Sequence, residues 1–91
     1  MRKITHEEFI DEAIVRVADY ESKREDIKTL VTVEDVFTVW SCKTLQNSKA
    51  LLSAKHKGAY YYEFTLNGDK GEIYMDVYKK QENIKIMPIN L

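Results

Sequence analysis

This chain has few of the residue types and segments that would indicate a particular class of protein. Its 91 residues include one cysteine, one proline and three glycines, and no long hydrophobic run. Because Cys42 is alone, no disulfide can form within the chain, which favours a reducing compartment. No apolar run approaches the ~20 residues of a membrane-spanning helix, and residues 1–8 lack the apolar segment of a signal peptide. We therefore expect a cytoplasmic protein.

Motifs for catalysis and for cofactors are also missing. The chain has no glycine-rich phosphate loop, no Ser-His-Asp order and no zinc-ligand spacing. Cys42, His6 and His56 could supply a thiol with a base or a metal site, but they fall in an apolar strand, a helix start and a loop. A buried free cysteine commonly has no chemical role. We expect no enzyme activity, no metal site, no catalytic residue and no cofactor.

The composition indicates one ordinary globular domain over residues 1–91, with 44% hydrophobic and 32% charged residues. A net charge of −1 gives no overall attraction to nucleic acid or anionic lipid. The charge is unevenly distributed, because residues 1–35 hold ten acids and six bases while residues 36–91 hold five acids and eight bases. The predicted helix and linker are thus acidic, and the predicted sheet is mildly basic.

A helix is predicted from His6 to about Ser22. Thr5-His6-Glu7-Glu8 forms a capping box, in which the side chains of Thr5 and Glu8 satisfy each other's backbone N–H groups. Ile4 and Phe9 occupy the positions of a hydrophobic staple. An apolar stripe follows at helical spacing: Phe9, Ile10, Ala13, Ile14, Val17 and Ala18. After this helix comes a charged linker, residues 23–35, in which Thr32–Asp35 can begin a single helical turn.

Alternating β-branched and aromatic residues predict strands in the rest of the chain. The predicted strands are residues 36–42, 50–54, 59–66 and 72–78, with a short last strand at 83–86. Pairing should end near Met87 because Pro88 cannot donate to a ladder. The predicted fold is α+β, one N-terminal α-helix packed on a four-stranded, mostly antiparallel sheet (a meander) spanning about residues 36–87.

The first predicted strand has large apolar groups on both faces, Val36 and Trp40 on one and Phe37 and Val39 on the other. This pattern indicates a central strand or a sheet covered on both sides. A single helix covers only one face of such a sheet. We therefore expect the second face to self-associate or to bind a partner, unless residues 23–35 fold over it.

The hairpin over residues 59–78 has two unequal faces. Its apolar face should form the core, with Phe9, Ile14 and Val17 of the helix buried against Tyr62, Phe64, Ile73 and Met75. The other face carries tyrosines among carboxylates. A two-residue turn at Asn67-Gly68 would set Glu63 opposite Glu72, and like charges so placed are destabilising. We therefore expect a turn centred on Gly68-Asp69, with Glu63 beside Tyr74 and Tyr61 beside Asp76.

The tyrosine face is the candidate binding site, because protein interfaces favour Tyr and Trp. The candidate residues are Tyr61, Glu63, Tyr74, Asp76 and Tyr78 on this face, with Lys43, Gln46 and Asn47 near the preceding turn. The leading hypothesis is a protein-binding module, with a homodimer as the economical arrangement. Glu63 and Asp76 could instead divide acid and base roles, but we interpret them as part of a solvated sheet face.

A nucleic-acid-associated protein is the alternative, with lysines tracking a phosphate backbone while tyrosines stack on bases. Two observations weigh against it. Carboxylates share the tyrosine face, and arginine is absent after position 24. The lysines concerned are Lys43, Lys49, Lys55, Lys57, Lys79 and Lys80.

Several strings resemble a small family of bacteriophage and prophage proteins that has no assigned biochemical function. They are Thr5-His6-Glu7-Glu8-Phe9-Ile10, the segment from Val39 to Asn47 (VWSCKTLQN) with Lys49-Ala50-Leu51-Leu52, Tyr61-Tyr62-Glu63, Asn67-Gly68-Asp69-Lys70 and the segment from Glu72 to Lys80 (EIYMDVYKK). The resemblance implies an origin in a phage or prophage genome of a low-GC Gram-positive bacterium, with action in the host cytoplasm. A host factor, a defence component or a phage replication protein would then be the partner. The family offers no catalytic residue to carry over.

Overall fold

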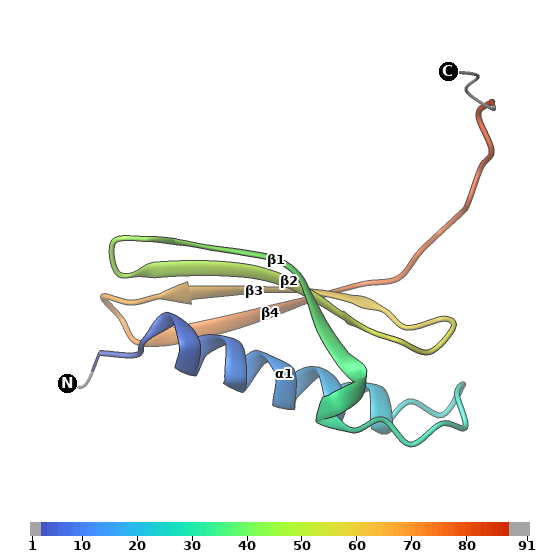
Figure 1. The fold of residues 1–91 in the computed structure, drawn as a ribbon, viewed down its shortest axis with the longest axis horizontal. Helices are drawn as coiled ribbons and strands as arrows, with labels where there is room; N and C mark the ends of the chain where they lie inside the picture. The colour runs from blue at the N-terminus through green and yellow to red at the C-terminus, as the bar shows by residue number, and fades with distance from the viewer. Residues whose placement is uncertain (1–2, 88–91) are drawn as a thin grey trace.

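The chain forms one N-terminal helix and a four-stranded antiparallel sheet in a computed structural model, which describes residues 3–87 (Figure 1). Strand order in the sheet follows chain order, β1-β2-β3-β4. The predicted α+β fold is therefore confirmed. No helix within residues 3–87 is long and apolar enough to cross a membrane. The elements are α1 (His6–Ser22), the 3₁₀ turn η1 (Val33–Asp35), β1 (Val36–Thr44), β2 (Asn47–Ala54), β3 (Tyr61–Asn67) and β4 (Glu72–Tyr78).

Helix α1 begins and ends where the sequence predicts. The Glu8 N–H donates to the Thr5 hydroxyl at 3.0 Å, and the Thr5 N–H donates to Oε1 of Glu8 at 3.2 Å, so the predicted capping box is present. At the other end, the N–H of Lys23 donates to the carbonyl of Asp19. Two orphan donors at the N-terminus are thus satisfied by side chains, which fixes the start of the helix.

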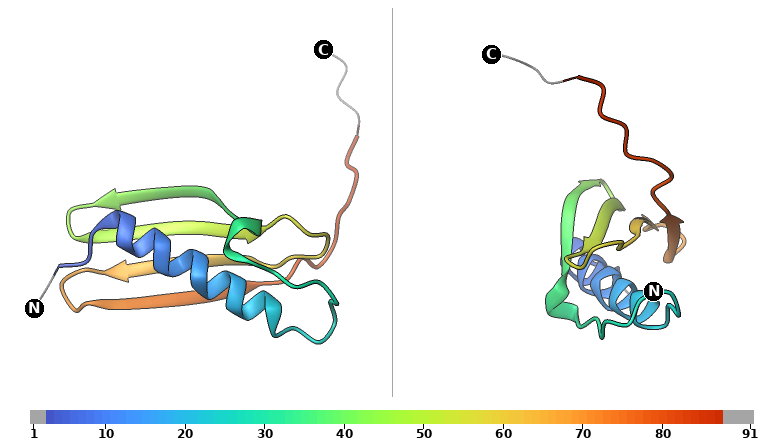
Figure 2. Two further views of the ribbon diagram at one scale, coloured as in Figure 1. Left: turned by 60° about the horizontal axis from the view of Figure 1, so that its bottom comes forward. Right: turned by 90° about the vertical axis from the view of Figure 1, so that its right-hand side faces the viewer.

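The core lies between α1 and one face of the sheet (Figure 2). Phe9 and Val17 of α1 and Tyr62 and Phe64 of β3 are almost fully buried, as predicted. The prediction is wrong for Met75, which is exposed. The reason is that α1 packs mainly over β1, β2 and β3, so that Met75 is left beside Glu12 and Arg16 of α1 at the wall of an open pocket. Ile14 and Ile73 are half-buried and pack against the margins of this core.

The sequence indicates a central strand or a sheet covered on both sides, but β1 is an edge strand. Only Val36 of its residues is buried. The ladder between β1 and β2 shifts between Thr38 and Trp40, so Val39 forms a β-bulge. Without this extra residue Trp40 would share the face of Val36, as predicted. With it, Trp40 stands opposite Leu51, on the face turned away from α1. The predicted face of Trp40 is therefore wrong.

The register of the β3–β4 hairpin also differs from the prediction. Asn67 pairs with Glu72, so a four-residue loop closes the hairpin, and Glu63 pairs with Asp76 rather than Tyr74. Tyr61 correspondingly pairs with Tyr78. The loop decides the register, because the Asn67 side chain accepts a hydrogen bond from the Lys70 N–H at 3.2 Å. Gly71 supplies the left-handed backbone, with φ of 66°.

The linker packs on the same side of the sheet as α1 (Figures 1 and 2). Val31 is buried in the core, and its carbonyl accepts a hydrogen bond from the Ser22 hydroxyl at 2.8 Å. The linker therefore leaves the opposite face of the sheet uncovered. Thr32 and η1 form the predicted helical turn, in which the Thr32 N–H donates to Oδ2 of Asp35 at 2.9 Å.

The predicted last strand is absent, because residues 79–87 form no strand. Pairing ends at Tyr78, and Pro88 lies outside the described residues. The segment leaves the end of β4 and rises on the side of the sheet away from α1 (Figures 1 and 2). Its aliphatic residues Ile84, Ile86 and Met87 are exposed.

Candidate functional site

The face of the sheet opposite α1, which we call the outer face, collects the candidate residues of the hairpin. Residues paired directly across strands share a face. One row runs from Trp40 through Leu51 and Glu63 to Asp76. A neighbouring row consists of Cys42, Lys49, Thr65 and Tyr74, and on the other side of the first row lie the pairs Phe37–Ser53 and Tyr61–Tyr78.

Aromatic and aliphatic side chains dominate the outer face, and they are open to solvent. Trp40 is 41% exposed and Tyr74 is 56% exposed. Phe37 and Val39 at the β1 edge are also exposed, as are Tyr61 and Tyr78. Soluble domains rarely expose adjoining large apolar groups unless the surface binds something. The bulge at Val39 enlarges this patch, because it brings Trp40 to the same face as Phe37.

Carboxylates lie among the tyrosines. Glu63 and Asp76 pair directly across β3 and β4. Lys49 offsets part of this charge, with its Nζ 3.6 Å from Oε1 of Glu63. The Tyr74 hydroxyl donates to Glu72, and this hydrogen bond raises the pKa of Tyr74. The outer face therefore combines an aromatic surface with net negative charge.

The three other candidate residues do not join this patch. Lys43 pairs with Ser48, whose hydroxyl is bonded to His6 of α1, so Lys43 belongs to the helix side of the sheet. Gln46 lies in the β1–β2 turn. Asn47 lies at the far end of the outer face, and its Oδ1 accepts a hydrogen bond from the Gly68 N–H at 3.1 Å.

Gln46 instead accounts for the glycine at position 68. A Cβ at this position would lie 1.9 Å from the carbonyl oxygen of Gln46, so only glycine allows the two turns to approach. The sequence string containing Gln46 and Asn47 and the string containing Gly68 therefore meet in space. Their role in the structure is to hold the β1–β2 and β3–β4 turns together.

The lysines of the nucleic-acid alternative are dispersed. Only Lys49 lies on the outer face, beside Glu63. Lys55 and Lys57 lie in the connection between β2 and β3, and Lys79 and Lys80 follow β4. The structure does not gather these lysines and the tyrosines into one continuous basic surface.

The three residues that could have formed a thiol or metal site lie apart. Cys42 is on the outer face and is exposed, so its predicted burial in an apolar strand is wrong. His6 is on the other side of the sheet, with ring nitrogens near the hydroxyls of Ser48 and Ser41 at 3.0 and 3.2 Å. His56 is in the β2–β3 connection. Among residues 3–87 no group of His, Cys, Asp and Glu is placed to hold a metal ion.

Sequence reasoning missed the most constrained polar residue, Glu21. This carboxylate at the end of α1 is fully buried. Its Oε1 accepts from His56 Nε2 at 2.6 Å, and its Oε2 accepts from the Tyr60 N–H at 3.2 Å and from the Tyr62 hydroxyl. Arg24 Nη1 donates to both oxygens, at 3.0 and 3.1 Å. A signal was present, because position 21 continues the four-residue spacing of buried Phe9, Ala13 and Val17.

Burial alone would raise the pKa of Glu21, but the hydrogen bonds from Tyr62, Tyr60, Arg24 and His56 outweigh it and lower that pKa. Burial and the hydrogen bond to Glu21 raise the pKa of the Tyr62 hydroxyl. We call these residues the Glu21 cluster. It joins the end of α1 to β3 and to the β2–β3 connection, and it orders the backbone immediately before Tyr61.

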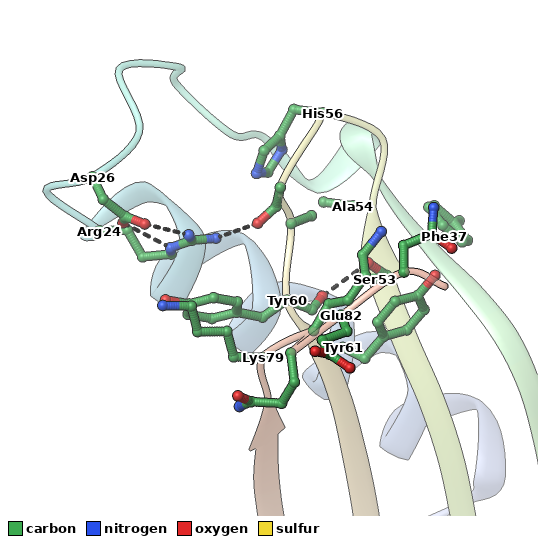
Figure 3. Close-up of a pocket in the computed structure, with 15 residues that line it drawn as sticks. Arg24, Asp26, Phe37, Ser53, Ala54, His56, Tyr60, Tyr61, Lys79 and Glu82 are labelled. Carbon is green, nitrogen blue, oxygen red and sulfur yellow. Dashed lines mark hydrogen bonds and ion pairs between the residues drawn. The ribbon is translucent and has the colours of Figure 1, made fainter. Parts of the chain in front are cut away.

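An open pocket of about 560 Å³ lies beside the Glu21 cluster, at the end of the outer face (Figure 3). Arg24 forms one wall, where it donates to Asp26 and to the Gly58 carbonyl and lies over the Tyr60 ring at 3.6 Å. Phe37 and Tyr61 of the outer face line the pocket, and so do residues 79–83. The segment after β4 therefore begins its course against the edge of the aromatic patch.

Comparison with known proteins gives a match over most of the chain. Residues 7–88 match a family of unknown function, DUF6275, and the match includes nearly all of α1 and all four strands. The chain therefore belongs to this family of unknown function. No curated protein and no solved structure matches it.

Proposed function

We propose that this protein is a binding module whose outer face engages another protein. The observation that supports the proposal is the adjoining exposed apolar surface of the outer face, which no other described element covers beyond the segment at its end. Large aromatic side chains with few rotatable bonds supply contact area at low entropic cost. The face also lies on a sheet backed by α1, so it is held in place before binding.

The resemblance to bacteriophage and prophage proteins sets the proposed context. We place the protein in the cytoplasm of a Gram-positive host, as a small accessory protein of a phage or prophage. The partner would be a host factor, a defence component or a phage replication protein. The carboxylates of the outer face favour a protein over a nucleic acid, because Glu63, Glu72 and Asp76 would repel phosphate.

The proposal is tested by affinity capture from host lysate, followed by mass spectrometry. Trp40→Glu and Tyr74→Glu place a charge on the outer face, at exposed positions where the fold should tolerate it. Val15→Glu makes the same kind of change on the exposed side of α1 and is the matched control. We expect the two outer-face variants to lose a partner that the wild type and the control retain. Equal capture by all four proteins would contradict the proposal.

Two single residues report directly on the outer face. Trp40 is the only tryptophan and Cys42 the only cysteine, and both lie on this face. Binding there should shift the emission of Trp40 to shorter wavelength and slow the alkylation of Cys42. An identified partner that leaves both signals unchanged binds elsewhere on the protein.

A further inference from the structure

Residues 79–87 leave their aliphatic side chains open to solvent. Ile84, Ile86 and Met87 are 64%, 84% and 68% exposed, although the sequence around them has the character of a strand. Such a segment gains little by remaining in water and gains free energy when its apolar groups are covered. The segment stands on the same side of the sheet as the outer face (Figures 1 and 2).

The segment and the outer face are complementary in charge. The segment carries Lys79, Lys80 and Lys85 against one acid, Glu82. The outer face carries Glu63, Glu72 and Asp76 against one base, Lys49. Within residues 83–87 the aliphatic groups flank Lys85, the one charged residue there, and they would thus meet aromatic groups between carboxylates. Both the apolar and the ionic parts of the contact favour the same pairing.

Geometry favours a second copy as the owner of the segment. Fully extended, residues 79–87 reach about 30 Å, which is long enough to cross an outer face of four strands about 14 Å wide. The segment leads away from its own sheet and contains neither glycine nor proline, the residues that most readily reverse a chain. A two-fold axis lets the segment of each copy reach the outer face of the other, so that every contact forms twice.

We propose that the protein forms a two-fold homodimer in which residues 83–87 of each copy lie on the outer face of the other copy. This inference rests on the proposed function, because it uses the same face, and it names the occupant as a second copy of this chain. Ile84 and Ile86, which share one side of the extended segment, cover the tyrosines and Trp40, while the long, flexible side chain of Lys85 reaches past the backbone to the negative charge around Asp76.

A charge exchange tests this arrangement by sedimentation velocity. The wild type should be a dimer at about 100 µM, and Asp76→Lys or Lys85→Glu alone should weaken dimerisation at least tenfold. In a mixed dimer of the two variants, one contact pairs the introduced lysine with the introduced glutamate, and the other keeps the native Asp76 and Lys85. An equal mixture should therefore recover the dimer. Asp11→Lys, an exposed acid on α1, is the control and should leave the dimer intact.

Deletion of residues 83–91 gives an independent result. It should produce a monomer with unchanged circular dichroism, and Cys42 should then react with maleimide faster than in the wild type. A wild-type monomer at this concentration overturns the proposal, and so does a dimer that survives the deletion or a mixture that stays monomeric. If the wild type is a monomer and the outer-face variants still lose a lysate partner, the dimer proposal is overturned. The proposed function is then still supported.

Discussion

Nε2 of His56 lies 2.6 Å from Oε1 of Glu21, and this contact ties the β2–β3 connection to the end of α1. The two residues are far apart in sequence, and both are polar, although position 21 continues the spacing of the buried helix residues. Glu21 has four hydrogen-bonding partners for its two oxygens, which compensates for the burial of its charge. The Glu21 cluster therefore holds α1 on the sheet at the end where the outer face and the pocket meet.

Substitution of Glu21 should be costly even when its shape is kept. Glu21→Gln presents one amide oxygen and one amide NH₂ to four donors, so donors of Tyr62, Arg24 or His56 lose their acceptor. Loss of one member of a buried charged network costs about 3–5 kcal/mol. Urea unfolding should show this loss, whereas Glu12→Gln, at an i,i+4 ion pair on the surface of α1, should change stability by less than about 0.5 kcal/mol. Equal effects of the two substitutions would contradict a stabilising role for the cluster.

Stability should fall in acid because the pKa of Glu21 is lower in the folded protein than its usual value of 4.5. A lowered pKa means that the unfolded chain takes up the proton first, so the contribution is complete above the unfolded value and is lost as pH falls through the folded value. Urea midpoints measured from pH 7 to pH 3 should decline below about pH 5. In Glu21→Gln this decline should be shallower. A parallel decline in both proteins would assign it to other carboxylates.

Truncating each of the two residues that pair across the β3–β4 hairpin should lower the free energy of unfolding by very different amounts. Phe64 is 1% exposed beneath α1, and Met75, its partner in the ladder, is 36% exposed. Phe64→Ala should cost about 3–5 kcal/mol, through lost burial and the cavity that remains. Met75→Ala should cost well under half as much, because its side chain is already partly exposed to solvent. A urea midpoint unchanged by Phe64→Ala would show that the faces of β3 are reversed.

Local signals were sufficient to predict the helix and the four strands of the sheet, but they also predicted a strand at residues 83–86 that is absent. The bounds of α1 follow from a capping box and an apolar stripe, both of which depend on residues within a few positions of one another. The alternation of Tyr62, Phe64 and Leu66 likewise places β3 with its core face toward the helix. These patterns are predictable because each is set by the period of a single element.

The features that sequence reasoning missed depend on one extra residue or on distant contacts. Val39 adds a residue to β1, and this reverses the face of Trp40, since the side-chain period of a strand is two. The four-residue loop moves Glu63 opposite Asp76, which the like-charge argument did not anticipate. Glu21 looks like an ordinary helix acid until His56 and Tyr62 are brought to it by the sheet.

The pair of carboxylates on the outer face should stabilise binding at the expense of the fold. Glu63 and Asp76 are direct cross-strand partners, and like charges so placed destabilise a hairpin. Asp76→Asn removes this repulsion and keeps the shape, so it should raise stability by about 0.2–1 kcal/mol at low salt. The gain should shrink at high salt, because exposed charges are screened. Thermal unfolding at low and high salt measures this gain on the variant that lacks residues 83–91, because loss of the dimer contact would lower the apparent stability of the full chain.

The same Asp76→Asn substitution should weaken association through the outer face, since it removes a charge that would meet a basic partner. A substitution that makes the protein more stable but weakens its binding is expected at a residue whose role is to contact the partner. Thr65→Ser is the matched control on the neighbouring row, and it should alter neither property. If Asp76→Asn lowers the stability of the variant that lacks residues 83–91, the carboxylate supports the fold, and its assignment to the binding surface is wrong.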